Sequence, residues 1–287
     1  MRRLRHIIEV AAASTLRLMM PKRFRTLFIS DIHLGAKSCQ AELLLNFLDW
    51  NKADTIYLVG DIVDGWRLKK TWFWPQAHND VVQAFLSLAQ GGTRVVFMPG
   101  NHDEFARDYL GHNFGGIEIV DHALHAGANG HDYLVIHGDQ FDAVVMHAKW
   151  LARLGDGAYR TAQAINARVS TVRRAMGLTY WSFSAWAKLK VKKAVNFISA
   201  FEATLAAEAR RRTARGVICG HIHHAAIRDM EGITYMNCGD WVESCTALAE
   251  HADGTFEIIN WGSALKVPDD GLQQPEGLAS RPASEFA

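Results

Sequence analysis

The chain has 287 residues, of which 49% are hydrophobic and 21% charged, and its formal net charge is +1. This length and apolar content suffice for one large domain, and the lack of any window of 18 apolar residues argues against a membrane-spanning helix. The four cysteines show no C-x-x-C spacing, so we expect free thiols in a reducing cytoplasm rather than disulfides or a thiolate zinc site.

Residues 1–20 predict a short amphipathic helix. Apolar side chains such as Leu4 and Ile8 recur at helical spacing, with most charged residues on the other side. A secretory signal is disfavoured, because Glu9 and Arg17 interrupt the apolar stretch and no clear cleavage site follows. The helix could lie on an anionic membrane surface or pack against the protein, and the sequence leaves both readings open.

Short apolar runs that end in Gly or polar residues predict the strands of a sheet. They are rich in Val, Ile, Phe and Tyr, as buried strands are. The runs cover 25–30, 55–60, 94–100, 133–139, 215–220 and 233–239. Helical patterns at 41–52 and 77–90 lie between them, and this alternation predicts a layered α/β architecture.

The stretch 142–213 interrupts the alternation and predicts a helical cap inserted between two strands. It holds 13 Lys/Arg against 4 Asp/Glu, and its aromatic residues, such as Trp181 and Trp186, lie close to lysines. That composition favours contact with an anionic lipid leaflet, while a solvated helical face and single-stranded nucleic acid are the alternatives. The tail, residues 263–287, has three of the six prolines and few large apolar residues, so we expect disorder.

Polar clusters follow five of the apolar runs, at the strand ends where α/β sheets bind ligands. The clusters contain Asp31 and His33, Asp61 and Asp64, Asn101, His102 and Asp103, His137 and Asp139, and His221, His223 and His224. Each alone is compatible with an ordinary turn, but five in order argue against a purely structural role. Carboxylate, imidazole and carboxamide ligands without thiolate suit two divalent ions, either Mn²⁺, Fe²⁺ or Zn²⁺, with Asp61 the best candidate for a bridging ligand.

The block order D-x-H, G-D, G-N-H-D/E, H-G-D and G-H-x-H resembles the calcineurin-like metallophosphoesterases over roughly residues 25–262. The resemblance implies central β-sheets flanked by helices in a domain over 21–262, with a helical cap, and two metal ions, Mn²⁺ being preferred. It implies ligands Asp31, His33, Asp61 and His223 for one ion and Asp61, Asn101, His137 and His221 for the other. It also implies that His102 is the acid facing the leaving group, steadied by Asp103.

The closing "GDWVES" and the helical insertion resemble the branch of UDP-2,3-diacylglucosamine hydrolases, which act on a lipid A precursor. That branch has Arg where this chain has His102. Pyrophosphate cleavage expels a stable phosphomonoester, whereas phosphodiester cleavage expels an alkoxide and gains ~10²–10⁴-fold from a general acid. A histidine can supply that proton and an arginine cannot. This argument favours a phosphodiester substrate.

Stretches including "YLVGDIVDGW", "NHDEF", "HAKWLA" and "GHIHHAAI" also resemble the phospholipase C-type metallophosphoesterases of alphaproteobacteria. We therefore expect hydrolysis of phosphatidylcholine or phosphatidylethanolamine to diacylglycerol, by a cytoplasmic protein bound peripherally to the inner membrane. The alternatives are pyrophosphate hydrolysis of UDP-2,3-diacylglucosamine, a nuclease or cyclic-nucleotide phosphodiesterase, and a binding scaffold without catalysis. We expect a lipid substrate and no nucleic acid, and nothing indicates an obligate protein partner.

Further polar and aromatic residues lie close in sequence to the five clusters. We expect some to orient the metal ligands, namely Asp64, Asp139 and Asp240. Trp66 and Arg67 follow the Asp61 turn and are candidates for substrate contact, and His224 is either structural or orients a ligand. The segment 71–76 could line an acyl entrance or form an ordinary core patch.

Overall fold

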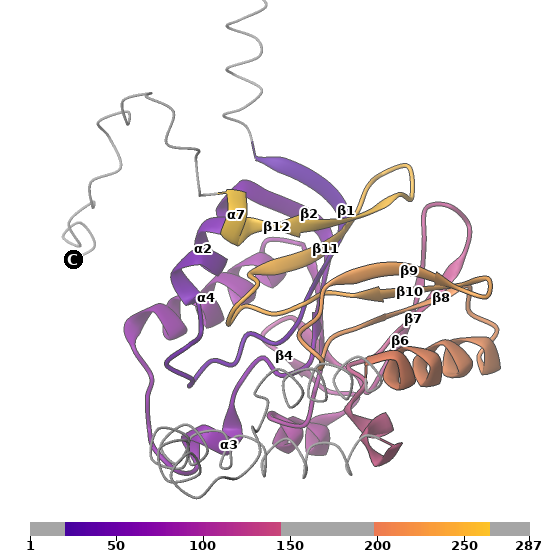
Figure 1. Ribbon diagram of the computed structural model, residues 1–287. Helices are drawn as coiled ribbons and strands as arrows, with labels where there is room; N and C mark the ends of the chain where they lie inside the picture. Colours follow the sequence, from indigo (N-terminus) through magenta and orange to yellow (C-terminus); the bar gives the residue numbers. More distant parts are fainter. Residues whose placement is uncertain (1–20, 145–197, 265–287) are drawn as a thin grey trace, which may run out of the picture.

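The computed structural model describes residues 21–144 and 198–264. Two β-sheets form the centre of the molecule, and helices lie outside them (Figure 1). The layered α/β architecture predicted from the sequence is confirmed.

The larger sheet has seven strands in the order β12-β11-β1-β2-β3-β5-β4. Their bounds are β1 Lys22–Ile29, β2 Asn51–Val59, β3 Arg94–Met98, β4 Asn113–Phe114, β5 Ile117–Ile119, β11 Thr246–Glu250 and β12 Phe256–Asn260. The central strands β1, β2, β3 and β5 are parallel, and antiparallel strands complete both edges. The carboxyl ends of β1, β2 and β3 therefore meet at one side of the sheet, where their polar loops begin.

The smaller sheet has five strands in the order β6-β7-β8-β10-β9. Their bounds are β6 Ala123–Ala126, β7 Asp132–Val135, β8 Gly216–Cys219, β9 Ala226–Met230 and β10 Ile233–Asn237. Strands β7, β8 and β10 are parallel, and β6 and β9 pair antiparallel at the edges. The loops after β7 and β8 consequently leave the sheet on the same side.

The two sheets face each other across an apolar core, and helices cover their outer faces. In β1, Leu27 and Ile29 pack with α2 (Ala41–Trp50) and α4 (Gln76–Gln90), whereas Phe28 points to the smaller sheet. Phe28 stacks on Tyr57 there, with ring centroids 5.1 Å apart. A helix over residues 198–211 covers the other side of the smaller sheet. Because both faces of β1 are buried, its sequence is an almost continuous apolar run.

A buried ionic cluster around Glu250 connects the two sheets. Glu250, at the end of β11, is fully buried and accepts hydrogen bonds from Arg25 (2.7 and 2.8 Å), Thr26 (2.9 Å) and the Ala128 N–H (2.8 Å). His125 of β6 lies 2.8 Å from the same carboxylate. Burial alone would raise the pKa of Glu250, but these partners, His125 foremost, lower it to about 2.

The predicted elements agree with the structure except at some ends. All six apolar runs contribute to strands, namely β1, β2, β3, β7, β8 and β10. The helix predicted over 77–90 is α4, whereas the helix predicted over 41–52 stops at Trp50 because Asn51 already begins β2. Strands β4, β5, β6, β9, β11 and β12 were not predicted, and four of them, β4, β6, β9 and β12, lie at the edges of the sheets.

Three of the predicted segments fall largely outside the described residues. The N-terminal helix over 1–20 lies outside them, and so does the tail over 263–287 apart from two residues at the end of α7 (Trp261–Ala264). Of the predicted cap over 142–213, the described part includes the helix at 198–211, while 145–197 lie outside.

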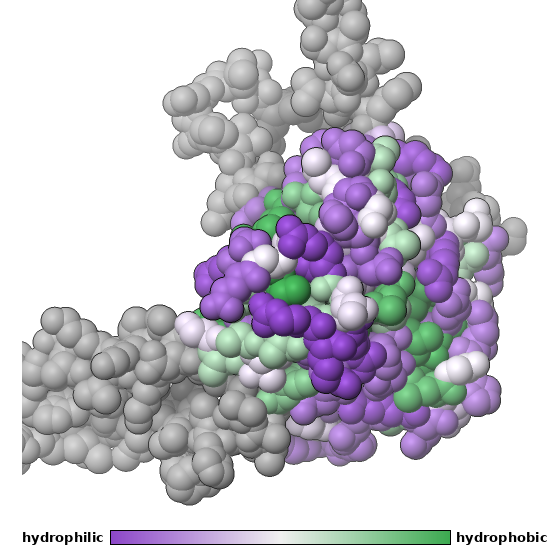
Figure 2. Space-filling view, turned by 90° about the vertical axis from the view of Figure 1, so that its right-hand side faces the viewer, coloured by the Kyte–Doolittle hydropathy of each residue, from purple (hydrophilic) through white to green (hydrophobic). Residues whose placement is uncertain are grey.

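The surface beside the smaller sheet is mainly hydrophilic, with hydrophobic patches between polar residues (Figure 2). Its exposed large apolar side chains include Leu124 and Ile227. No helix in the described part of the chain is long and apolar enough to cross a membrane.

Candidate metal centre

The predicted site residues lie on loops that follow β1, β2, β3, β7 and β8. The first two loops run side by side, because the His33 N–H donates to the Asp61 carbonyl (2.9 Å) and the Leu34 N–H to the Ile62 carbonyl (2.8 Å). The loop after β8 joins them, since the His221 N–H donates to Asp31 Oδ2 (2.8 Å). Residues from both sheets are thus brought to one place.

Five of the predicted ligands have a left-handed backbone conformation. The φ angles are 53° at Asp31, 55° at His33, 54° at Asp61, 71° at His221 and 52° at His223. Non-glycine residues adopt this region rarely, and each costs on the order of 1–3 kcal/mol. Such strain concentrates at functional sites, and here it turns the side chains of neighbouring loops toward one another.

The first group of ligand atoms comes from Asp31, His33 and His223, and these atoms all lie within 4.8 Å of one another. His223 Nε2 is 3.1 Å from Asp31 Oδ1 and 3.3 Å from His33 Nε2. Two imidazole nitrogens and a buried carboxylate oxygen therefore lie close together, and such donors suit a divalent cation.

The second group comes from Asp61, His137 and His221, again within 4.8 Å. His137 Nε2 lies 3.4 Å from Asp61 Oδ1, and its other nitrogen, Nδ1, lies 2.9 Å from the Val59 carbonyl. That carbonyl can only accept, so Nδ1 carries the hydrogen and Nε2 is the atom available to a metal.

Asp61 lies between the two groups. Its Oδ1 faces His137, and its Oδ2 lies 3.8 Å from His33 Nε2 in the first group. Oδ1 also accepts the His102 N–H (2.8 Å), which fixes the orientation of the carboxylate. This is the placement expected of a carboxylate that bridges two ions.

The donor atoms fit a divalent metal. Asn101 Oδ1 is buried and has no hydrogen-bond partner among the described residues, a condition that is rare for buried amide oxygens. Together with the carboxylates and imidazoles it completes a set of hard and borderline ligands that suits Mn²⁺, Fe²⁺ or Zn²⁺. A cation would supply the missing partner.

Two glycines make room for these ligands. A Cβ at Gly60, where φ is +77°, would overlap the His137 ring, and a Cβ at Gly100 would overlap both Asp61 Oδ1 and His137 Nε2. Any side chain at either position would displace ligand atoms. Gly60 is therefore required both by its positive φ and by the close approach of His137, and Gly100 by the close approach of Asp61 and His137.

Burial and opposite charges shift the ionisation of the ligands strongly. Burial would raise the pKa of Asp61, but His137 and the other nearby imidazoles hold it well below its usual range. Burial would lower the pKa of His137, but Asp61 raises it to about 10. For His33, burial lowers the pKa. The carboxylates thus stay charged at neutral pH and attract cations to the site.

His102 forms a third group with His33 and Asp61, with ligand atoms within 4.8 Å of one another, but its hydrogen-bond partner differs from the one predicted. Its Nδ1 is 2.9 Å from Asp64 Oδ1, and its ring packs on Trp66 with centroids 4.4 Å apart. Asp103 was predicted to steady this ring, and that prediction is wrong. Asp64, fixed at the N-terminus of α3 (Gly65–Leu68), orients His102 instead, and Nε2 is left 3.9 Å from Asp61 Oδ2.

Asp103 braces the backbone of two loops. Its carboxylate is fully buried and accepts the N–H of Ile62 (2.7 Å), the N–H of Val63 (3.2 Å) and the N–H of Gly100. Burial, followed by the nearby charge of Asp61, raises the pKa of Asp103 to about 6. Its role is to hold the loops after β2 and β3 together.

The remaining predicted residues surround the ligands at different distances. Arg67 is exposed and pairs with Asp64 (3.2 Å), and Trp66 covers His102. Asp240 accepts the N–H of Val242 (2.8 Å) and thereby shapes the "GDWVES" turn. His224 is exposed and lies 3.4 Å from Arg228, outside both ligand groups.

Arg107 is a residue that the sequence did not reveal. Its Nη2 donates to both oxygens of Asp139 (2.8 and 2.9 Å) and to the Pro99 carbonyl (3.2 Å), so it ties the His137 loop to the Asn101 loop. It lies on the 3₁₀ helix η1 (Glu104–Tyr109). A single arginine in such a segment belongs to no recognisable sequence motif, so its role could not be predicted.

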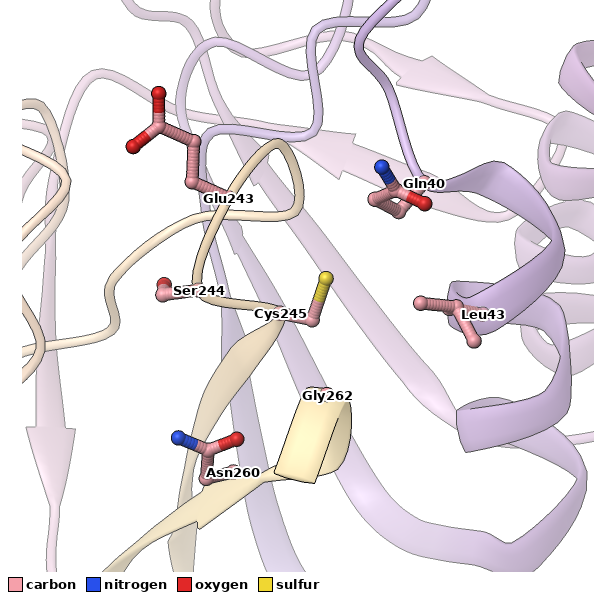
Figure 3. Close-up of a pocket in the computed structure, with 7 residues that line it drawn as sticks. All are labelled: Gln40, Leu43, Glu243, Ser244, Cys245, Asn260 and Gly262. Carbon is pink, nitrogen blue, oxygen red and sulfur yellow. The ribbon is translucent and has the colours of Figure 1, made fainter. Parts of the chain in front are cut away.

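A cavity of about 440 Å³ lies away from these loops. The N-terminal end of α2 lies on one side of it, and the turn before β11 on the other (Figure 3). It is lined by Gln40, Leu43, Glu243, Ser244, Cys245, Asn260 and Gly262. None of these is a predicted site residue.

Comparison with known families assigns the class of protein. The calcineurin-like phosphoesterase family matches residues 24–225, most of the chain, and the chain belongs to that family. It is accordingly a metal-dependent hydrolase. Solved structures such as the phosphoesterase YfcE from E. coli cover 82% of this chain at 12% identity with a TM-score of 0.39, which is too low to support any functional argument.

Curated relatives narrow the comparison within this family. The UDP-2,3-diacylglucosamine hydrolase of Xanthomonas axonopodis pv. citri is 30% identical over 245 residues, covering 80% of this chain and 96% of that protein. The protein of the same name from Chromohalobacter salexigens is 28% identical and covers 75% of this chain and 88% of its own length.

These relatives contradict the predicted phospholipase C activity and favour the pyrophosphate alternative. The prediction depended on a single residue, His102. The leaving-group argument was too narrow, because a protonated imidazole can also donate a hydrogen bond to phosphate oxygens, as an arginine does. His102 alone therefore does not distinguish a phosphodiester from a pyrophosphate.

Proposed function

We propose that the chain hydrolyses the pyrophosphate bond of UDP-2,3-diacylglucosamine, releasing UMP and the acylated sugar phosphate. The observation that carries the proposal is the extended similarity to hydrolases of that name, which spans 80% of this chain and nearly all of the Xanthomonas protein. All seven predicted ligands are present in this chain. Six of them, all but Asn101, lie in groups of closely spaced ligand atoms, which supports a catalytic protein rather than a scaffold that has lost its chemistry.

The proposal assigns two divalent ions to the centre. Asp31, His33, Asp61 and His223 would hold one, and Asp61, Asn101, His137 and His221 would hold the other. Such ions, when bound, polarise phosphoryl oxygens and make water a better nucleophile at neutral pH. Mn²⁺ is the ion assigned here, and the ligands, oxygen and imidazole without thiolate, suit Fe²⁺ or Zn²⁺ as well.

His102 and Asp64 would act on the substrate rather than on a metal. With Nδ1–H donated to Asp64, the ring holds Nε2 toward the ligand groups. A protonated Nε2 can donate a hydrogen bond to a phosphoryl oxygen and stabilise the charge that collects on it as the pyrophosphate breaks. Trp66 restricts the ring by packing on it, which preserves the direction of that bond.

Arg107 and Asp139 would keep the two halves of the centre together. Because the Arg107 guanidinium joins the Pro99 carbonyl to Asp139, it links the loop carrying Asn101 to the loop carrying His137. The proposal assigns Asn101 and His137 to the same ion, so the two loops must stay together. The arginine is therefore a positioning residue rather than a substrate contact.

The test is to incubate Mn²⁺-loaded protein with UDP-2,3-diacylglucosamine and identify the products by mass spectrometry. The proposal predicts UMP and the acylated sugar phosphate in equal amounts. His223→Ala should abolish the reaction, while His224→Ala, which changes a neighbouring histidine outside both ligand groups, should keep most of it. Absence of UMP with protein that holds its metal would overturn the proposal.

A further inference from the structure

The connection between α3 and α4 carries an unusual concentration of aromatic and basic residues. Residues 69–74, "KKTWFW", are called the aromatic loop below, and they begin directly after α3. Figure 1 shows this connection at the outer edge of the molecule, next to α3. Asp64, which orients His102, caps the helix that leads into the loop, so the loop starts close to the candidate centre.

Trp72 is the most exposed large hydrophobic residue among those described. Its exposed fraction is 75%, and its indole stacks only loosely on Trp74, with centroids 6.1 Å apart and an interplanar angle of 29°. Single exposed apolar side chains are common, whereas a group of exposed aromatic side chains rimmed by polar residues marks an interaction site. Tryptophan is also the side chain that prefers the boundary between lipid headgroups and acyl chains.

The base of the aromatic loop is rigid. Trp74 Nε1 donates to Asn79 Oδ1 (2.8 Å), and both Trp74 and Phe73 pack edge-on against His78, which is 98% buried. His78 Nδ1 in turn accepts the N–H of Gly35, two residues after the predicted ligand His33. The loop therefore presents Trp72 from a fixed support, so binding a partner would cost little conformational entropy.

Three lysines belong to the aromatic loop or contact it. Lys69 and Lys70 are exposed, and Lys37 Nζ lies 5.8 Å from the centre of the Phe73 ring. Within residues 21–144 and 198–264, none of these three lysines forms an ion pair with a carboxylate. Their charge is thus available to an external anionic surface, and lysines beside a bilayer each contribute about fivefold to its binding.

We propose that the aromatic loop docks the protein on an anionic lipid bilayer, with Trp72 in the headgroup boundary and Lys37, Lys69 and Lys70 facing anionic headgroups. The docking rests on the proposed function only for its purpose: a diacylated substrate resides in a bilayer, so a docked enzyme would meet it there. Docking next to α3 would bring the bilayer to the loops that carry the candidate centre.

Vesicle co-sedimentation with the full chain tests the docking without any substrate. The probes are phosphatidylcholine vesicles with and without phosphatidylglycerol, at low and high salt. We expect binding to the anionic vesicles that weakens with salt. Trp72→Ser should lower the partition coefficient, and the double change Lys69→Ser, Lys70→Ser should lower it about 25-fold, on the basis of the fivefold contribution per lysine.

The matched control is Leu124→Ser, which removes a 56% exposed apolar side chain from the smaller sheet and should leave binding unchanged. All four residues are exposed, and equal melting temperatures check that each variant folds. Unchanged vesicle binding in the loop variants would overturn the proposal. So would loop-dependent binding to single-stranded DNA in place of vesicles. Because sedimentation needs no turnover, its outcome is separate from the UMP assay.

Discussion

Replacing Asp64 by Asn tests how His102 is positioned. Asp64 Oδ1 lies 2.9 Å from His102 Nδ1 and also caps α3 by accepting the Arg67 N–H at 2.9 Å. Asn keeps the shape and the cap but loses the charge. A hydrogen bond to a charged group is worth ~1.5–3 kcal/mol and a neutral one ~0.5–1.5 kcal/mol, so the difference is about 1–2 kcal/mol. The ion pair with Arg67 adds little, because that side chain is 63% exposed.

The assay is the rate of UMP release, with metal content and melting temperature measured on the same preparations. A loss of 1–2 kcal/mol in the transition state lowers kcat about 5- to 30-fold. We expect that loss in Asp64→Asn, with metal content and melting temperature close to the parent protein. In a His102→Ala background the same substitution should have almost no further effect, because the two residues act as one unit.

Asp103→Asn is the informative control. Asp103 accepts from the N–H groups of Ile62, Val63 and Gly100 and does not contact the His102 ring, so its change should lower stability by ~1–3 kcal/mol together with metal affinity. If Asp103→Asn instead lowered kcat alone, or if Asp64→Asn and His102→Ala were additive, the positioning argument would be refuted.

Three further predictions follow from the ligand loops and the Glu250 cluster. Gly100→Ala should abolish metal binding, measured by mass spectrometry of bound metal, because its Cβ would overlap Asp61 and His137, and retained metal would contradict this. Chelation should lower both activity and melting temperature, and Mn²⁺ should restore both, whereas an unchanged melting temperature would argue against resident metal. The pKa of Glu250 is lowered from 4.5 to about 2, so its contribution of about 3 kcal/mol should be complete above about pH 4.5 and be lost as pH falls toward 2. In urea titrations Glu250→Gln should remove that part of the pH dependence, and an unchanged profile would refute the assignment.

The central strands could be predicted from sequence because both of their faces are buried. In β1 and β2, alternate residues pack on helices and on the opposite sheet, which leaves a continuous apolar run that is easy to recognise. Edge strands lack this signal. Three of the five residues of β9 are exposed, and its pairing with β10 depends on the partner rather than on its own pattern.

The candidate ligands could be proposed from the sequence because each follows a strand, but the roles of their neighbours could not. Asp64 and Asp103 both lie within three residues of a predicted site residue. Distance along the sequence therefore does not tell which of the two carboxylates orients His102. What separates them is side-chain direction. The turn after β2 leads into α3, which fixes Asp64 facing His102, whereas Asp103 points back to the Gly100 and Ile62 N–H groups. Only the folded loops supply that information.

The substrate was the part of the function least accessible to reasoning from residues. His102 was treated as deciding between an alkoxide and a phosphate leaving group, although an imidazole can serve either. The predicted metal ligands indicate that the centre can hydrolyse a phosphorus–oxygen bond, but they do not identify the substrate. Similarity along the whole chain, rather than one side chain, favours the pyrophosphate substrate.

Anomalous diffraction from crystals grown with Mn²⁺ is the most direct test of the metal centre. Two peaks should flank the Asp61 carboxylate, one beside Asp31, His33 and His223 and the other beside Asn101, His137 and His221. A single peak, or peaks away from Asp61, would contradict the assignment of a bridged two-metal centre to these loops.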